Sequence, residues 1–220
     1  MDKLGEMPTQ ADLALFPQAV RVIRATSRLV KLDFWVRNPD YLADELLTDV
    51  EEGSLGAAVG LPHAERMLAG SAPLLHLYPM QRYKYGAWEL PDNAFAVLKY
   101  LGLADQKRVR DLGAEGGARA RRDYFLFSEG ATRVVEMRAR VHQTEWYDQQ
   151  TDAIALLTVG STGAAAKLRQ YDQPDYASTP IGATIGPILH RVRKRFVEIA
   201  GQHGYTVQPT LAAAVGSTSV

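Results

Sequence analysis

The chain has 220 residues and carries 25 lysines and arginines against 25 aspartates and glutamates, with no cysteine. This length suits one compact domain or two small ones with a real hydrophobic core. The absence of cysteine excludes structural disulfides, cysteine-ligated zinc and a thiol nucleophile. No apolar run approaches membrane-spanning length and no signal-peptide pattern is present, so we expect a cytoplasmic protein that does not bind a membrane.

The first predicted elements are a helix over about residues 10–37 and a second helix that runs to about Glu52. Along the first helix, apolar residues alternate steps of four and three and so form one stripe: Leu15, Ala19, Val22, Ala25, Leu29, Leu32 and Val36. Asn38 and Pro39 signal the start of the second helix, because asparagine caps helices well and proline is tolerated in the first turn. The pattern predicts a helical hairpin whose second helix turns its acids outward.

Residues 53–80 are punctuated by glycine and proline, with a short helix expected over about 62–68. We interpret them as the connection that completes an amino-terminal region, residues 1–80. The alternating aromatics before Gly86 then predict a short strand that crosses to a helix over about residues 90–101.

That helix closes on the turn Leu101-Gly102-Leu103 and begins a recognisable order of elements. A polar gap rich in arginine follows, with Arg119, Arg121 and Arg122 placed where the first strand of a β-hairpin should begin. The β-favouring run Tyr124-Phe125-Leu126-Phe127 predicts a strand, and Ser128 caps a long helix that extends to about residue 159. Helix, turn, hairpin and helix in this order predict a winged helix-turn-helix over residues 81–160.

The remaining chain is divided into a carboxy-terminal helical extension, residues 161–208, and a tail, residues 209–220. A last helix is expected over about 181–200, and the tail, rich in alanine, glycine, serine and threonine, is expected to be disordered. The predicted fold class is therefore mainly α with a small β-hairpin: a winged helix-turn-helix with an amino-terminal helical hairpin and carboxy-terminal helices.

The motifs around the predicted winged helix resemble a known family. Tyr83-Lys84-Tyr85-Gly86, the Leu101-Gly102-Leu103 turn and the segment from Tyr124 to Gly130 are similar to the YwgA-type winged helix of toxin–antitoxin and phage-defence proteins. The segment from Lys31 to Leu42 resembles middle components of ABC-three-component defence systems, which accompany an SMC-like ATPase. The resemblance implies an accessory subunit with protein partners encoded by neighbouring genes. The chain departs from the family pattern at Phe127-Ser128-Glu129-Gly130 and at Gly86-Ala87.

Charge is distributed unevenly along the chain and suggests two kinds of contact surface. Arginines on a wing can reach phosphates or a narrow minor groove, so the expected DNA-binding residues are Lys107, Arg108, Arg110, Arg119, Arg121 and Arg122. An acidic stretch and a basic stretch can each dock a complementary protein surface, so the expected partner-binding residues are Asp40, Asp44, Glu45, Asp49, Arg191, Arg193, Lys194 and Arg195. The alternative for both sets is a solvated face with local ion pairs.

Catalytic chemistry finds little support in the sequence. The glycine turn at residues 160–163 lacks the Gly-Lys-Ser/Thr ending of a phosphate-binding loop, and the histidines are scattered without a two-histidine motif. We therefore expect no catalytic residues, no metal ligands and no cofactor. The predicted function is a non-catalytic accessory subunit of a bacterial multi-protein assembly, for defence or with an SMC-like ATPase, that bridges partners and touches DNA. The alternative is a dimeric winged-helix transcriptional regulator or antitoxin, with the long helix that carries Trp146 and Tyr147 as a homodimer seam.

Overall fold

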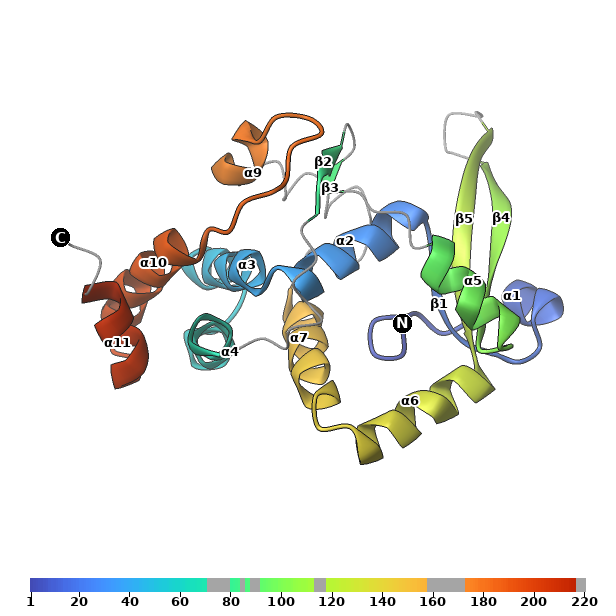
Figure 1. Ribbon diagram of the computed structural model, residues 1–220, viewed down its shortest axis with the longest axis horizontal. Helices are drawn as coiled ribbons and strands as arrows, with labels where there is room; N and C mark the ends of the chain where they lie inside the picture. Colours follow the sequence, from blue (N-terminus) through green and yellow to red (C-terminus); the bar gives the residue numbers. More distant parts are fainter. Residues whose placement is uncertain (71–79, 84–85, 88–91, 113–117, 158–172, 217–220) are drawn as a thin grey trace.

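The computed structural model describes residues 1–70, 80–83, 86–87, 92–112, 118–157 and 173–216. Within them the chain is mainly helical with a small three-stranded antiparallel sheet, so the predicted fold class is confirmed (Figure 1). The glycine turn at 160–163 and the first part of the carboxy-terminal extension, up to residue 172, lie outside the described residues.

The secondary structure follows this order along the chain. The described helices are α1 (Gln10–Leu15), α2 (Thr26–Arg37), α3 (Pro39–Glu51), α4 (Ala57–Ala69), α5 (Asp92–Tyr100), α6 (Ser128–Arg140), α7 (Thr144–Leu156), α9 (Pro174–Ser178), α10 (Leu189–Gln202) and α11 (Pro209–Gly216). The described strands are β1 (Ala19–Ile23), β2 (Arg82–Tyr83), β3 (Gly86–Ala87), β4 (Ala104–Leu112) and β5 (Ala118–Phe127).

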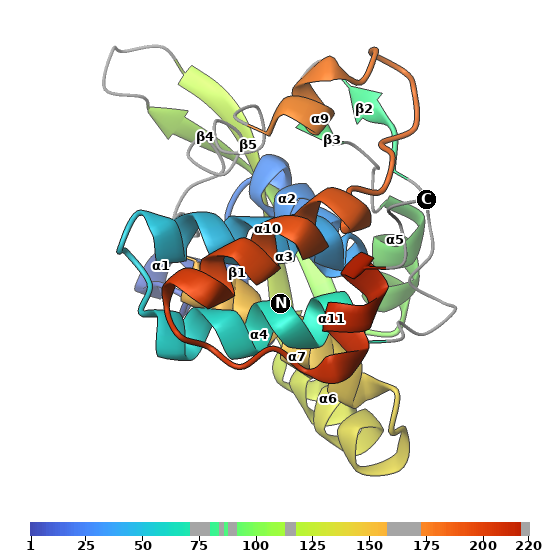
Figure 2. The same ribbon diagram turned by 90° about the vertical axis from the view of Figure 1, so that its left-hand side faces the viewer.

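The main core lies between helices from both ends of the chain. Helices α3, α4 and α10 lie side by side in both views, with α2 and α7 packed beside α3 (Figures 1 and 2). Trp35, Phe34, Tyr41 and Phe196 are almost fully buried in this core. Burial of such large apolar side chains is the main favourable contribution to folding, so the amino- and carboxy-terminal helices form one unit.

The three strands form a separate layer beside the helices, in the order β1-β5-β4. Strand β1 corrects the prediction of a single helix over residues 10–37. Val22 and Ile23 pair with Phe125 and Tyr124 of β5 and are buried. The run Ala-Val-Arg-Val-Ile is β-favouring, and pairing with a strand far along the chain outweighs the helical spacing of its apolar residues.

Three further predictions of secondary structure are wrong. The helix after the wing is not continuous, because it breaks between α6 and α7, where Thr144 donates a hydrogen bond to the carbonyl of Val141 at 2.6 Å. The tail forms helix α11, since Leu211 is buried against the main core. The predicted strand before residue 90 is instead an antiparallel pair of β2 and β3, with Tyr83 opposite Gly86.

Candidate nucleic-acid interface

The hairpin of β4 and β5 projects from the sheet and is preceded by a helix and a tight turn (Figures 1 and 2). Gly102 has a φ of 69°, a conformation that glycine adopts without strain, and it joins α5 to β4. Strands β4 and β5 pair in register from Ala104 opposite Leu126 to Leu112 opposite Ala118. The order helix, turn, hairpin, helix is the order that the sequence predicts for a winged helix, with β1 as the third strand of the sheet.

The packing of α5 shows which face of the wing lies toward this helix. The ring of Phe95, the only buried residue described in α5, contacts the ring of Tyr124 edge-on, with 4.8 Å between centroids. Side chains on a strand alternate between faces, and directly opposite residues share a face. Arg122 therefore lies on the face of Tyr124, as do Arg108 and Arg110 on β4.

This face gathers three guanidinium groups. Arg108 is directly opposite Arg122, and Arg110 lies two residues further toward the tip. Arg122 forms an ion pair with Asp92 at the start of α5, at 3.2 Å. Arg108 and Arg110 are exposed and make no hydrogen bond or ion pair to the other described residues. Like charges directly opposite each other destabilise a strand pair, so this face carries an arrangement that an anion would stabilise.

The opposite face of the wing uses its charges differently. Lys107 is exposed, whereas Asp123 opposite it is almost fully buried. Asp123 accepts hydrogen bonds from Arg121 at 2.8 Å and from the backbone amide of Ala25 at 3.1 Å. Asp123 thus joins β5 to the start of α2, and the guanidinium of Arg121 is engaged with this buried carboxylate.

The position of the predicted arginines within the hairpin is also corrected. The first wing strand is β4, which begins at Ala104 directly after the turn, and Arg119, Arg121 and Arg122 lie on the second strand. The backbone of Arg119 pairs opposite Asp111. Lys107, Arg108 and Arg110 remain as the exposed cations of the first strand.

Helix α5 presents a different chemistry from the wing beside it. Val97 and Leu101 are more than half exposed and Tyr100 is 90% exposed. The single basic side chain of the helix, Lys99, forms an ion pair with Asp105 at 2.7 Å. Base reading in a major groove uses polar and charged side chains of the inserted helix, and on α5 Asp92 and Lys99 are engaged in ion pairs while Asn93 is exposed.

The acidic and basic stretches that were expected to dock partners face each other within the molecule. Asp44 is 1% exposed and forms ion pairs with Arg191 at 2.9 Å and Arg195 at 2.5 Å. Arg193 donates to the backbone carbonyl of Leu68 at 2.7 Å.

Three further acids of α3, Asp40, Glu45 and Asp49, are also buried, so the expectation that they point outward is wrong, whereas Glu51 at the end of the helix is exposed. Asp40 accepts from the amide of Ile188 at 2.7 Å, next to the first residue of α10, and burial raises the pKa of its carboxyl. Glu45 accepts from Gln173 at 3.3 Å, and Asp49 is fully buried. Only Lys194 of the predicted partner-binding residues is exposed, because α10 packs against α3 and takes up the other charges.

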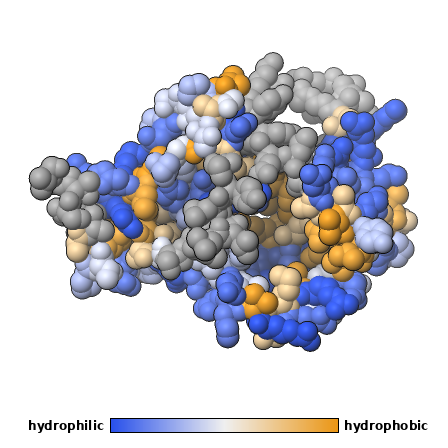
Figure 3. All heavy atoms as spheres, in the orientation of Figure 1, coloured by the Kyte–Doolittle hydropathy of each residue, from blue (hydrophilic) through white to orange (hydrophobic). Residues whose placement is uncertain are grey.

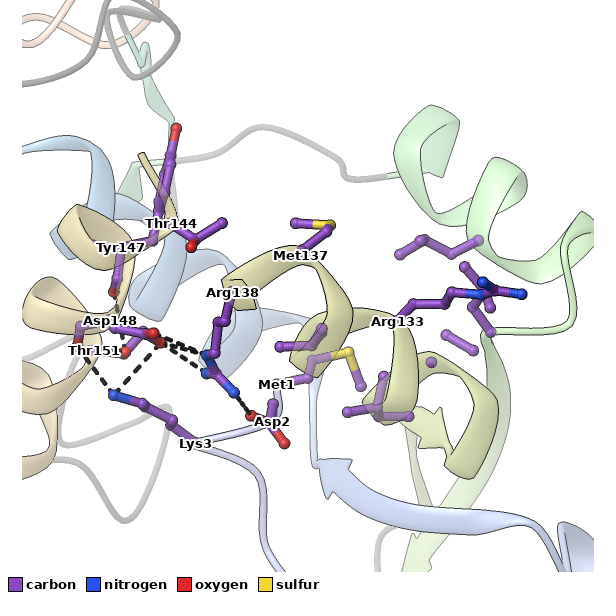
Figure 4. Close-up of a pocket in the computed structure, with 16 residues that line it drawn as sticks. Met1, Asp2, Lys3, Arg133, Met137, Arg138, Thr144, Tyr147, Asp148 and Thr151 are labelled. Atoms are coloured by element: carbon purple, nitrogen blue, oxygen red, sulfur yellow. Dashed lines mark hydrogen bonds and ion pairs between the residues drawn. The ribbon is translucent and has the colours of Figure 1, made fainter. Parts of the chain in front are cut away.

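A cavity of about 380 Å³, which the sequence did not indicate, lies between α6, α7 and the first residues of the chain (Figure 4). At one end Arg138 binds Asp148 and Asp2, each at 2.7 Å, and Lys3 also contacts Asp148 (Figure 4). The hydrogen bonds from Arg138 are the largest cause of the lowered pKa of the Asp148 carboxyl. The opposite end is lined by apolar side chains such as Leu103. The charges of Arg138, Asp148, Asp2 and Lys3 pair with one another, so the cluster joins three segments.

Comparison of the chain with protein-family models, with curated proteins and with solved structures finds no match. Among the described residues, no group of three or more histidine, aspartate or glutamate side chains is placed to hold a metal ion. No helix within the described ranges is long and apolar enough to cross a membrane.

Proposed function

We propose that this chain is a non-catalytic winged-helix subunit of a bacterial multi-protein assembly and that it contacts the phosphate backbone of DNA through its wing. The resemblance to middle components that accompany SMC-like ATPases supports the first part of the proposal. The second part rests on one observation: Arg108 and Arg122 face each other across the hairpin, with Arg110 beside them and on the α5 side.

The contact we propose is independent of base sequence. Exposed arginines supply salt-dependent affinity for phosphates, while base readout needs hydrogen-bonding side chains in a groove. The second half of α5 exposes Val97, Leu98 and Tyr100, and its lysine is paired. Binding should therefore be weak at physiological salt and similar for different duplexes, as suits a subunit that is held on DNA by its partners.

The test compares the double variant Arg108→Ala/Arg110→Ala with wild type in fluorescence-anisotropy titrations of a labelled mixed-sequence duplex at several salt concentrations. Each lost phosphate contact should make the slope of log K against log salt shallower by about 0.9. The matched control is Arg66→Ala/Lys194→Ala, which removes the same charge from exposed sites on α4 and α10. Equal slopes for the two double variants would overturn the wing contact.

A dimeric regulator or antitoxin is the second candidate, and the exposed apolar side chains of α5 and α6 favour it. Such a protein would bind one defined duplex with a dissociation constant of roughly 10⁻⁸ M or lower at physiological salt. Pull-down of the tagged full chain from its native host, with mass spectrometry of the bound proteins, separates the two candidates. Recovery of an ATPase encoded by a neighbouring gene supports the subunit, whereas its absence together with tight sequence-specific DNA binding supports the regulator.

A further inference from the structure

Helix α6 buries very little of its surface within the chain. Of its 13 residues only Gly130 is buried, while Val135 is 63% exposed and Met137 is 52% exposed. The helix runs along the lower edge of the molecule, away from the layer of α3, α4 and α10 (Figures 1 and 2). Most of the stability of a protein helix comes from packing an amphipathic face, and the described residues supply little such packing for α6.

A groove of about 500 Å³ runs between α6 and the turn that follows α5. Its apolar lining consists of Leu101, Leu103, Met137 and Val141. Apolar atoms gather over α5 on the face of the molecule that carries this helix (Figure 3). Contiguous exposed apolar surface with a polar rim is typical of a protein–protein contact.

The charged wall of the groove is a single stripe along α6 in which acids and bases alternate. Its members are Glu129, Arg133, Glu136 and Arg140. Their spacing of four, three and four residues places them on one side of the helix. Within the chain, Arg133 pairs with Glu129 and Glu136, each at 2.9 Å, and all three side chains remain 41% exposed or more.

This stripe is complementary to itself when a second copy is turned end to end. Around a two-fold axis at the middle of the stripe, Glu129 of one copy lies opposite Arg140 of the other, and Arg133 lies opposite Glu136. All four cross-pairs then join opposite charges. A parallel arrangement in register would place like charges opposite each other throughout, which is destabilising.

We propose that the groove between α5 and α6 docks a second copy of this chain, with the two α6 helices antiparallel. The shared surface is self-complementary, as a two-fold interface must be. An α6 of 13 residues is about 20 Å long, and the neighbouring end of α5 adds Tyr100, which is 90% exposed. Exposed aromatics of this kind are frequent anchors of interfaces.

The test is a charge swap followed by sedimentation equilibrium without DNA. Glu129→Arg/Glu136→Arg makes the stripe wholly basic, and Arg133→Glu/Arg140→Glu makes it wholly acidic. Each double variant alone should dimerise at least about tenfold more weakly than wild type, because every cross-pair becomes repulsive. An equimolar mixture of the two should recover wild-type affinity, and so should the quadruple variant that exchanges all four charges.

The control matched to Glu129→Arg/Glu136→Arg is Glu52→Arg/Glu198→Arg, which makes the same change in net charge at exposed sites away from α6. It should leave the dimer unchanged, and circular dichroism of each variant checks that the helices remain folded. A wild-type chain that stays monomeric, a dimer that tolerates both stripe variants, or a mixture that fails to recover affinity would each overturn the proposal. These outcomes do not involve DNA, so they are independent of the wing contact.

Discussion

Arg24 joins two carboxylates of the amino-terminal segment to a carboxylate of the distant strand β5. Its guanidinium contacts Asp12 at 2.7 Å, Glu6 at 3.2 Å and Asp123 at 3.4 Å. Asp12 also forms a reciprocal cap with Thr9 at the start of α1. Burial by itself would raise the pKa of the Asp12 carboxyl, but the hydrogen bonds from Arg24 and Thr9 outweigh it and lower the pKa from 3.8 to about 2.

The lowered pKa of Asp12 makes stability depend on pH in the acid range. A carboxyl whose pKa is lower in the folded state stabilises the fold above its unfolded pKa, and this contribution is lost as the pH falls from about 4 to about 2. We expect Asp12→Asn to lower the free energy of unfolding by about 1–2 kcal/mol at pH 7 and by much less near pH 2. Urea titrations at both pH values measure the difference. Glu52→Gln, at an exposed site, serves as control, and a gap between wild type and Asp12→Asn that persists at pH 2 would contradict the assignment.

Single residues also show where sequence reasoning stops. The exposed cations Lys107, Arg108 and Arg110 follow from the sequence, because a polar strand next to a glycine turn has few neighbours to pair with. The role of Asp44 does not follow. Its partners Arg191 and Arg195 are brought near only by the packing of α10 on α3, and local sequence spacing carries no information about these contacts.

Helix α6 depends on one close approach at its start. A Cβ atom at Gly130 would lie 2.3 Å from the carbonyl oxygen of Leu103 and 2.8 Å from a methyl group of Leu126. The same carbonyl accepts a hydrogen bond from the amide of Phe127 at 3.0 Å. The backbone of α6 therefore rests directly on the turn that ends α5, which sets the position of the groove between the two helices.

We expect Gly130→Ala to destabilise the protein by about 1–3 kcal/mol, because the backbone must shift to admit the methyl group. Gly201→Ala is the matched control, since a Cβ at that position in α10 meets nothing within 4 Å. There the substitution should raise stability by up to about 1 kcal/mol through the helix preference of alanine. Thermal unfolding followed by circular dichroism compares the two variants. Equal melting temperatures would show that α6 does not approach Leu103 closely.

Elements were predicted correctly where their signals are local. Asn38 and Pro39 mark the start of α3, and Gly102 marks the turn between α5 and the wing. Strand β1 was missed because its partner β5 lies far along the chain, and its apolar spacing also fits a helix. The break between α6 and α7 was missed because the apolar pattern continues across it, while the direction of each helix is set by what it packs against.

At the scale of the whole molecule, the two ends of the chain are joined by charge as well as by apolar packing. Helix α10 lies against α3 and α4 (Figure 2). Arg191 and Arg195 reach Asp44 from α10, and Arg195 also contacts Glu51. The acidic stretch has no lysine or arginine of its own, so α10 supplies the neutralising charges that a buried acidic helix requires.

This pairing predicts that Asp44 acts on folding and not on the binding of a partner. Asp44→Ala removes the buried acid that Arg191 and Arg195 share, and because both are partly exposed and keep a second carboxylate, Asp175 or Glu51, we expect a loss of about 2–3 kcal/mol in the free energy of unfolding. Glu52→Ala removes an exposed acid next to the end of the same helix and should change stability by less than about 0.5 kcal/mol. Urea unfolding followed by the fluorescence of the three tryptophans measures both variants. If the two variants unfold at the same urea concentration, α10 does not neutralise α3, and the acidic helix is again available as a surface for partners.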